Sequence, residues 1–146
     1  MKVSLDTNIF LAVKNKEPEF KYCKRIIDSI ESKQLEGALS SIVLAEVLVG
    51  FYQNKETDKA HRFSSKAILN YDILEVSLEI AQKAAKIRAE HNIKLPDAII
   101  AASTIEAEAD YFISQDQTLL KRLEIKKIAP REFVDCHLES TENNEY

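Results

Sequence analysis

The sequence predicts an α/β fold, with a largely parallel sheet and helices on both of its faces. Short apolar segments with the length and composition of buried strands recur at residues 2–5, 36–40, 71–76, 111–114 and 125–128. Longer segments with helical spacing lie between them, and alternating strands and helices are typical of a parallel sheet. The 146 residues are 45% hydrophobic and show no composition shift, so we expect one domain over residues 1–138 and a disordered acidic tail over residues 139–146.

The first half of the chain has local signals for three helices. Residues 9–13 follow the first predicted strand and are compatible with a helix, and Pro18 suits the first turn of another that runs to about Gln34. Ser41 is expected to cap a helix that starts at Ile42 and continues through Tyr52. Since this helix is apolar on every side except at Glu46, we expect it to be buried.

The second half is predicted to contain further helices in the same alternation. An amphipathic helix is expected over residues 56–70, and Ser77 is expected to cap one that runs to about Asn92. Leu95-Pro96-Asp97 opens the next helix, and a short helix is expected over residues 119–123. Pro130 and the residues after it carry no predicted element before the tail.

Composition excludes several classes of function. Only two glycines are present, which rules out a Walker loop or a GxGxxG dinucleotide site. The two cysteines and three histidines have no zinc spacing, and the net charge of −4 argues against nucleic-acid binding by bulk charge. No segment has the length of a membrane span or the pattern of a signal peptide, so we expect a cytoplasmic protein with no membrane contact.

Four acidic residues are the candidates for a functional site. Asp6 and Asp116 each follow a predicted strand, and Asp97 begins a predicted helix, positions where an acid is also an ordinary turn or helix-capping residue. Glu46 is harder to explain as a structural residue, because an ionised carboxylate in an apolar helix needs a partner. No Lys or Arg lies one helical turn from Glu46 in either direction.

Taken together, the four acids predict a metal site. In a parallel sheet, Asp6, Asp97 and Asp116 would emerge at the same edge. Four carboxylates gathered there would repel one another and acquire raised pKa values unless a cation relieved the repulsion. Ligation by oxygen alone indicates Mg²⁺ or Mn²⁺, and such ions commonly activate water for attack on a phosphodiester.

The motifs that contain these acids resemble those of the PIN-domain ribonucleases, and in particular the VapC-type toxins. The matching segments are Leu5-Asp6-Thr7-Asn8, Ser41 to Leu48, Leu95 to Ala102, and Ser114-Gln115-Asp116. The resemblance implies a three-layer α/β/α sandwich that cleaves RNA with an acidic quartet, here Asp6, Glu46, Asp97 and Asp116. It also implies a homodimer and a cognate antitoxin. One departure is that no aromatic residue follows Asp116, and Asp110 is a competing acid at the opposite edge of the sheet.

Roles follow from this arrangement as hypotheses. Asp6 and Asp97 are expected to be direct metal ligands, with Glu46 and Asp116 completing the site and one of them orienting the attacking water. Asn8 and Ser114 are candidates for holding the carboxylates in place, and Lys94 and Lys121 for contacting flanking phosphates.

Two alternatives to a toxin stay open, an RNA-processing nuclease that is not a toxin and a non-catalytic interaction module. A phosphoryl-accepting aspartate enzyme is disfavoured, because the first motif lacks a second Asp beside Asp6.

Overall fold

The computed structural model describes residues 1–138, and the predicted tail over residues 139–146 lies outside the described residues. Its centre is a five-stranded sheet in the order β3-β2-β1-β4-β5, and every neighbouring pair is parallel. The predicted α/β class with a largely parallel sheet is therefore confirmed. The strands are β1 (Lys2–Leu5), β2 (Glu36–Ser40), β3 (Tyr71–Leu74), β4 (Tyr111–Ile113) and β5 (Lys127–Ile128).

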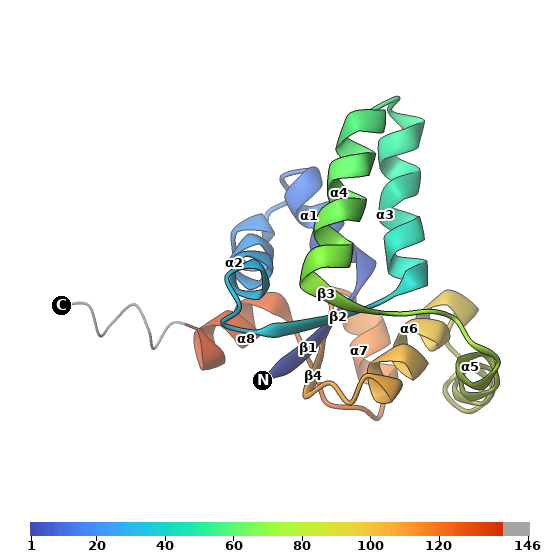
Figure 1. Ribbon diagram of the computed structural model, residues 1–146. Helices are drawn as coiled ribbons and strands as arrows, with labels where there is room; N and C mark the ends of the chain where they lie inside the picture. The colour runs from blue at the N-terminus through green and yellow to red at the C-terminus, as the bar shows by residue number, and fades with distance from the viewer. Residues whose placement is uncertain (139–146) are drawn as a thin grey trace.

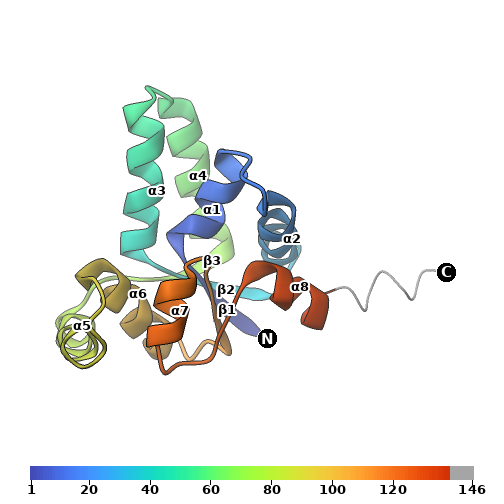
Figure 2. The same ribbon diagram turned by 180° about the vertical axis from the view of Figure 1, so that it is seen from behind.

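Helices cover both faces of this sheet and complete a three-layer α/β/α sandwich. Helices α1 to α4 lie on one side of it and α5 to α7 on the other, while α8 lies beside α2 (Figures 1 and 2). Helices α3 and α4 pair and project together away from the sheet (Figure 1). The helices are α1 (Thr7–Lys14), α2 (Phe20–Glu31), α3 (Ser41–Gln53), α4 (Thr57–Asn70), α5 (Leu78–His91), α6 (Leu95–Glu106), α7 (Gln117–Arg122) and α8 (Pro130–His137).

The central strand β1 is buried on both faces because helices cover both. Val3 and Leu5 are fully buried, and the intervening Ser4 is only 2% exposed. The hydroxyl of Ser4 accepts a hydrogen bond of 2.8 Å from Thr104 on α6, which satisfies the polar group inside the core. A strand placed in this way ends at a fixed point of the sheet, so the residue that follows it is held rigidly.

The predicted caps are confirmed at one helix and wrong at another. Ser77 accepts a hydrogen bond from the backbone N–H of Ile80 and caps α5, as expected. The cap of α3 is Ser40 and not Ser41, because Ser40 has extended backbone angles and accepts from the N–H of Ile42, whereas Ser41 already belongs to the helix. Two adjacent serines offer the same capping chemistry, so the sequence does not distinguish them.

The region after Pro130 contains a helix that the sequence analysis did not predict. In α8, Pro130 stands in the first turn, and Phe133 and Val134 are buried against the core. The apolar stripe is only about two turns long, which is too short for a periodic signal. Within residues 1–138, none of the helices combines the length and the apolar character needed to cross a membrane.

Candidate active site at the carboxyl edge of the sheet

Asp6 occupies the junction between β1 and α1 and is held by three hydrogen-bond donors. Its backbone N–H continues the sheet by donating to the carbonyl of Ile113 in β4 at 3.0 Å. One carboxylate oxygen, Oδ1, accepts from the N–H of Thr7 at 2.8 Å, as a helix cap does. The other, Oδ2, accepts from the Ser114 hydroxyl at 2.7 Å and from the Asn8 amide at 3.2 Å. Asp6 is thus both a cap and a fixed, buried acid, and the two interpretations are compatible.

Ser114 is the centre of the hydrogen-bond network around Asp6. It is fully buried just after β4, and its hydroxyl oxygen accepts from the Asn8 amide at 3.1 Å and from the N–H of Asp116 at 3.0 Å while donating to Asp6. The Asn8 amide oxygen accepts in turn from the N–H of Gln115 at 3.1 Å. These bonds tie the end of β1 to the end of β4. Asn8 and Ser114 therefore contact the residues that the sequence analysis expected them to support.

The pKa values of Asp6 and Asp97 are raised, in part by the negative charges of the other candidate acids. Burial raises the pKa of Asp6 to about 6, and the negative charges of Asp97 and Glu46 add to this effect against the hydrogen bonds from Ser114 and Thr7. Asp97 is half-buried in the first turn of α6. Burial raises its pKa as well, and Asp116 and Glu46 raise it further, while Lys94 opposes them. Mutual repulsion of this kind is what the grouping of acids at one edge predicts.

Glu46 corrects one expectation, because its side chain is exposed and not buried. It lies in the second turn of α3 and accepts a hydrogen bond of 2.8 Å from the Thr7 hydroxyl, which directs it toward the β1–α1 junction. The fully apolar sequence of α3 does not mean burial on all sides. Val43 and Val47 face the core, whereas Val49 and Tyr52 are 51% and 52% exposed.

Asp116 is exposed and caps α7. Its Oδ1 accepts from the N–H of Leu119 at 3.0 Å, so the capping interpretation is realised here too. Asp110, the competing acid, is placed at the opposite edge as expected, where it accepts from the N–H of Lys2 at 2.8 Å.

The four candidate acids offer the ligand atoms that a hard cation prefers, but their side chains are only partly in position to bind one. All four candidate ligands are carboxylates, which suit Mg²⁺ or Mn²⁺. Within residues 1–138, however, no three His, Cys, Asp or Glu side chains are already grouped closely enough to hold a metal ion. Asp6 and Asp97 are the more buried pair, whereas Glu46 and Asp116 are exposed and each is held by a single side-chain hydrogen bond. Binding would therefore require the two exposed side chains to turn inward.

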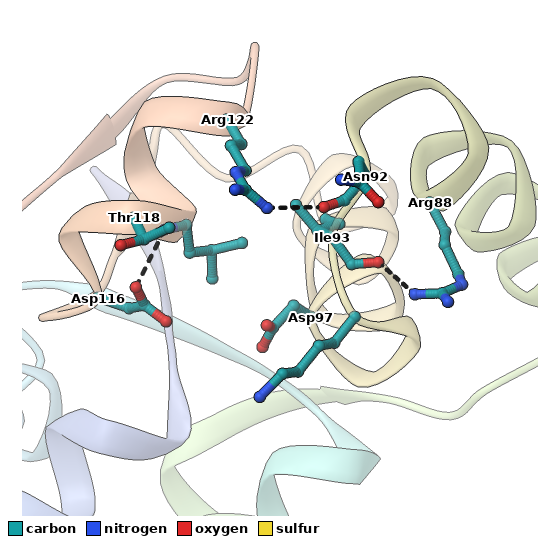
Figure 3. Close-up of a pocket in the computed structure, with 9 residues that line it drawn as sticks. Arg88, Asn92, Ile93, Asp97, Asp116, Thr118 and Arg122 are labelled. Carbon is teal, nitrogen blue, oxygen red and sulfur yellow. Dashed lines mark hydrogen bonds between the residues drawn. The ribbon is translucent and has the colours of Figure 1, made fainter.

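A cleft of about 430 Å³ opens beside Asp97 and Asp116 (Figure 3). Lys94 lines it, as predicted for a phosphate contact, but Lys121 does not. Arg88 and Arg122 line it instead, and neither was a candidate in the sequence analysis. Their positions beside the acids depend on how α5 and α7 pack around the loop before α6, which no local pattern reveals. The full lining is Arg88, Asn92, Ile93, Lys94, Asp97, Asp116, Thr118, Leu119 and Arg122.

Comparison with known proteins places the chain in a family. The PIN domain family matches residues 3–126, which include all four acids. This chain belongs to the PIN domain family. No curated protein sequence matches the chain.

Several solved structures share this PIN fold at low sequence identity. VapBC2 from Rickettsia felis, bound to a DNA fragment from its promoter, has a TM-score of 0.69 and 24% identity over 88% of this chain and 98% of its own. FitAcB from Neisseria gonorrhoeae has a TM-score of 0.70 and 20% identity over 88% and 98%. VapC20 from Mycobacterium tuberculosis, described as a toxin that cleaves the sarcin-ricin loop, has a TM-score of 0.63 and 17% identity over 85% and 98%.

Proposed function

We propose that this PIN-domain protein is an endoribonuclease that hydrolyses RNA phosphodiester bonds with Mg²⁺ or Mn²⁺ at Asp6, Glu46, Asp97 and Asp116. The observation that carries the proposal is the Asp6 carboxylate. It is 6% exposed, its pKa is raised by burial and by neighbouring acids, and no cationic side chain of residues 1–138 forms an ion pair with it. A buried acid kept among other acids is costly, and such costs are typical of functional sites.

In the proposed mechanism the chain's own residues hold the cation and take a proton from the attacking water. Asp6 and Asp97 would hold the cation, with Glu46 and Asp116 turning toward it from either side. Once bound, a hard divalent cation supplies positive charge that polarises the phosphodiester and lowers the pKa of water. Glu46 or Asp116, both exposed to solvent, would accept the proton of the attacking water. Ser114 and Asn8 would keep Asp6 Oδ2 pointing at the site through their hydrogen bonds.

Partners are proposed from the neighbours and from the surface. The similar structures include VapBC2 and FitAcB, and a toxin-antitoxin complex from Klebsiella pneumoniae. We propose that this chain, folded as one domain over residues 1–138, is the toxin of such a pair, is held inactive by an antitoxin in the cytoplasm, and forms a homodimer.

The surface of the protein is consistent with such contacts. Apolar side chains are exposed on α3 and α4, among them Tyr52 at 52%, Ile68 at 69% and Leu69 at 78%. An apolar groove of about 330 Å³ lies between α1, α2, α3 and α4, and Tyr71 contributes to it. Exposed apolar surface of this kind commonly marks contacts with other proteins.

RNA cleavage by the purified protein tests the enzymatic part of the proposal. Labelled single-stranded RNA should be cut in Mn²⁺ or Mg²⁺ and left intact in chelator. Asp6→Asn should abolish cutting, whereas Asp110→Asn, which removes an acid at the opposite edge of the sheet, should leave it unchanged. Equal loss in both variants, or cleavage that persists in chelator, would contradict the four-acid site.

Growth of a bacterial host tests the toxin part separately. Expression of the wild type should arrest growth, expression of Asp6→Asn should not, and co-expression of the adjacent reading frame should relieve the arrest. An RNA-processing nuclease that is not a toxin would cut RNA in the first assay and leave growth unaffected in the second.

A further inference from the structure

Three cationic side chains stand on the wall of the cleft beside the acids. Arg88 comes from the last turn of α5, Arg122 from the last turn of α7, and Lys94 is the residue that precedes α6. Asp97 and Asp116 line the same cleft, so it carries cations on one part of its surface and carboxylates on another (Figure 3).

The two arginines are held in place by the loop between α5 and α6. Arg88 Nη1 donates to the carbonyl of Ile93 at 2.6 Å, and Arg122 Nη1 donates to the carbonyl of Asn92 at 2.8 Å. The guanidinium groups thus approach neighbouring carbonyls of one loop from two different helices (Figure 3). Because each guanidinium has five N–H donors, most of the donors of each arginine are left for another acceptor.

The three cations of this wall (Arg88, Lys94 and Arg122) form no ion pair with a carboxylate of residues 1–138, although the charge of Lys94 lowers the pKa of Asp97. The ion pairs formed among residues 1–138 involve other lysines, and none includes Arg88, Lys94 or Arg122. The chain as a whole carries a net charge of −4, so three cations gathered at the rim of an acidic site are a local departure from its overall charge. An anion that enters this cleft would meet two guanidinium groups that the loop holds in place, with the ammonium group of Lys94 on the same lining.

We infer that the cleft binds a backbone phosphate of single-stranded RNA next to the scissile one, through Arg88, Arg122 and Lys94. The inference rests on the proposed ribonuclease function and adds a subsite to it. A strand bound there would have one phosphate on the cationic wall while the next lies toward the carboxylates. Phosphate contacts of this kind set register and carry little base information, so the subsite would position the strand and not select its sequence.

A structural role for the arginines predicts different behaviour. If Arg88 and Arg122 only support the loop through the two carbonyls, their removal would lower stability and would weaken RNA binding whatever the charge of the individual phosphates. A phosphate subsite instead makes the effect of each variant depend on one particular phosphate of the RNA. The test therefore changes protein and RNA together.

The probes are short single-stranded 2′-O-methyl RNA oligonucleotides, each with one linkage replaced by an uncharged methylphosphonate. Binding to the full-length protein is followed by fluorescence anisotropy in chelator, where no cleavage occurs. The variants are Arg122→Gln and Arg88→Gln. Their matched controls are Lys121→Gln and Lys86→Gln, which remove exposed cations from the same two helices but outside the cleft. Thermal melting of each variant reports any damage to the fold.

In the wild type and in both controls, one methylphosphonate position should weaken binding by about 10-fold, the size expected for a charge-assisted hydrogen bond. In Arg122→Gln and Arg88→Gln the same position should have little further effect. The slope of log affinity against log salt should become shallower by about 0.7 for each phosphate that a variant no longer neutralises. If the variants weaken binding equally at every methylphosphonate position, or if the controls behave like them, the subsite is refuted.

The two proposals fail in different ways. Position-dependent binding without metal-dependent cleavage of unmodified RNA would refute the proposed nuclease and keep the phosphate site. Metal-dependent cleavage without position-dependent binding would keep the nuclease and refute the subsite.

Discussion

The metal-free protein should become less stable as the pH rises, because Asp6 is a buried acid. Burial raises the pKa of Asp6 from 3.8 to about 6. Between these two values the folded protein keeps a proton that the unfolded chain has released, so the free energy of unfolding falls as pH rises from about 4 to about 6 and then levels off. This difference in the pKa of Asp6 between the unfolded and the folded state corresponds to about 3 kcal/mol in the free energy of unfolding, which is a large part of a small domain's stability.

Urea unfolding in chelator at a series of pH values measures this effect. Other carboxyl groups titrate in the same range, so the informative quantity is the difference between wild type and Asp6→Asn, in which the contributions of groups that do not interact with Asp6 cancel. Relative to the wild type, the free energy of unfolding of Asp6→Asn should rise by up to about 3 kcal/mol as the pH rises from about 4 to about 7. Asp135→Asn, which removes an exposed acid on α8, should follow the wild type at every pH.

A difference that stays constant with pH would show that Asp6 titrates like an exposed acid, and would refute the reasoning from burial and repulsion. Saturating Mn²⁺ supplies a second check on the same samples. A cation bound to the ionised form of Asp6 should flatten or reverse the pH dependence of the wild type, because the metal stabilises only the folded state.

Three further substitutions test other features of the structure. Ser114→Ala removes the hydroxyl that bonds Asp6, Asn8 and Asp116, so we expect a loss of about 1–3 kcal/mol in urea unfolding and a roughly 10-fold weaker Mn²⁺ affinity by calorimetry; unchanged affinity would mean that the network does not position Asp6. Glu46→Gln should stay within about 0.5 kcal/mol of wild type in chelator, since the side chain is exposed and its amide oxygen still accepts from Thr7, yet should lose much of the thermal stabilisation by Mn²⁺. Tyr71→Phe deletes a buried hydroxyl that has no hydrogen-bond partner among residues 1–138, so its melting temperature should equal or exceed that of the wild type; a clear decrease would reveal a partner for that hydroxyl.

The alternation of strands and helices was predictable because a parallel sheet imposes it on the sequence. A strand covered by helices on both faces must bury the side chains of both faces, and β1 does so with Val3, Ser4 and Leu5, of which only Ser4 is polar. The edge at which Asp6 and Asp116 emerge follows from the same rule. The exclusion of Asp110 also follows, because it precedes its strand.

The solvent exposure of individual side chains was less predictable than the elements to which they belong. Glu46 belongs to a helix whose neighbouring residues are apolar, and apolar sequence is consistent either with a buried helix or with one that presents apolar side chains to solvent. Val49 and Tyr52 on α3 show that the second case applies here. The mistake about Glu46 and the exposed apolar surface of α3 therefore have the same physical origin.

No local sequence pattern predicts the cationic wall that Arg88, Lys94 and Arg122 form in the cleft. Arg88 and Arg122 lie 34 positions apart in the sequence and meet only because α5 and α7 pack on either side of one loop. Asn92, the first residue of that loop, adopts a left-handed backbone conformation with φ of 51°, and its carbonyl accepts a hydrogen bond from Arg122. An arginine in the last turn of a helix more often has an ordinary solvated role, so sequence alone gives no reason to single out either one.

The pairing of the first strand with the fourth has a consequence for how the protein is made. Asp6 lies beside Ser114, which is 108 residues further along the chain, and its backbone N–H bonds Ile113. In a chain emerging from the ribosome Asp6 precedes Ser114, and the groove for β1 between β2 and β4 does not exist until Ser114 has also emerged. An incomplete nascent chain therefore lacks the assembled acid site. A protein with this strand order acquires its acid site only after Ser114 has been translated.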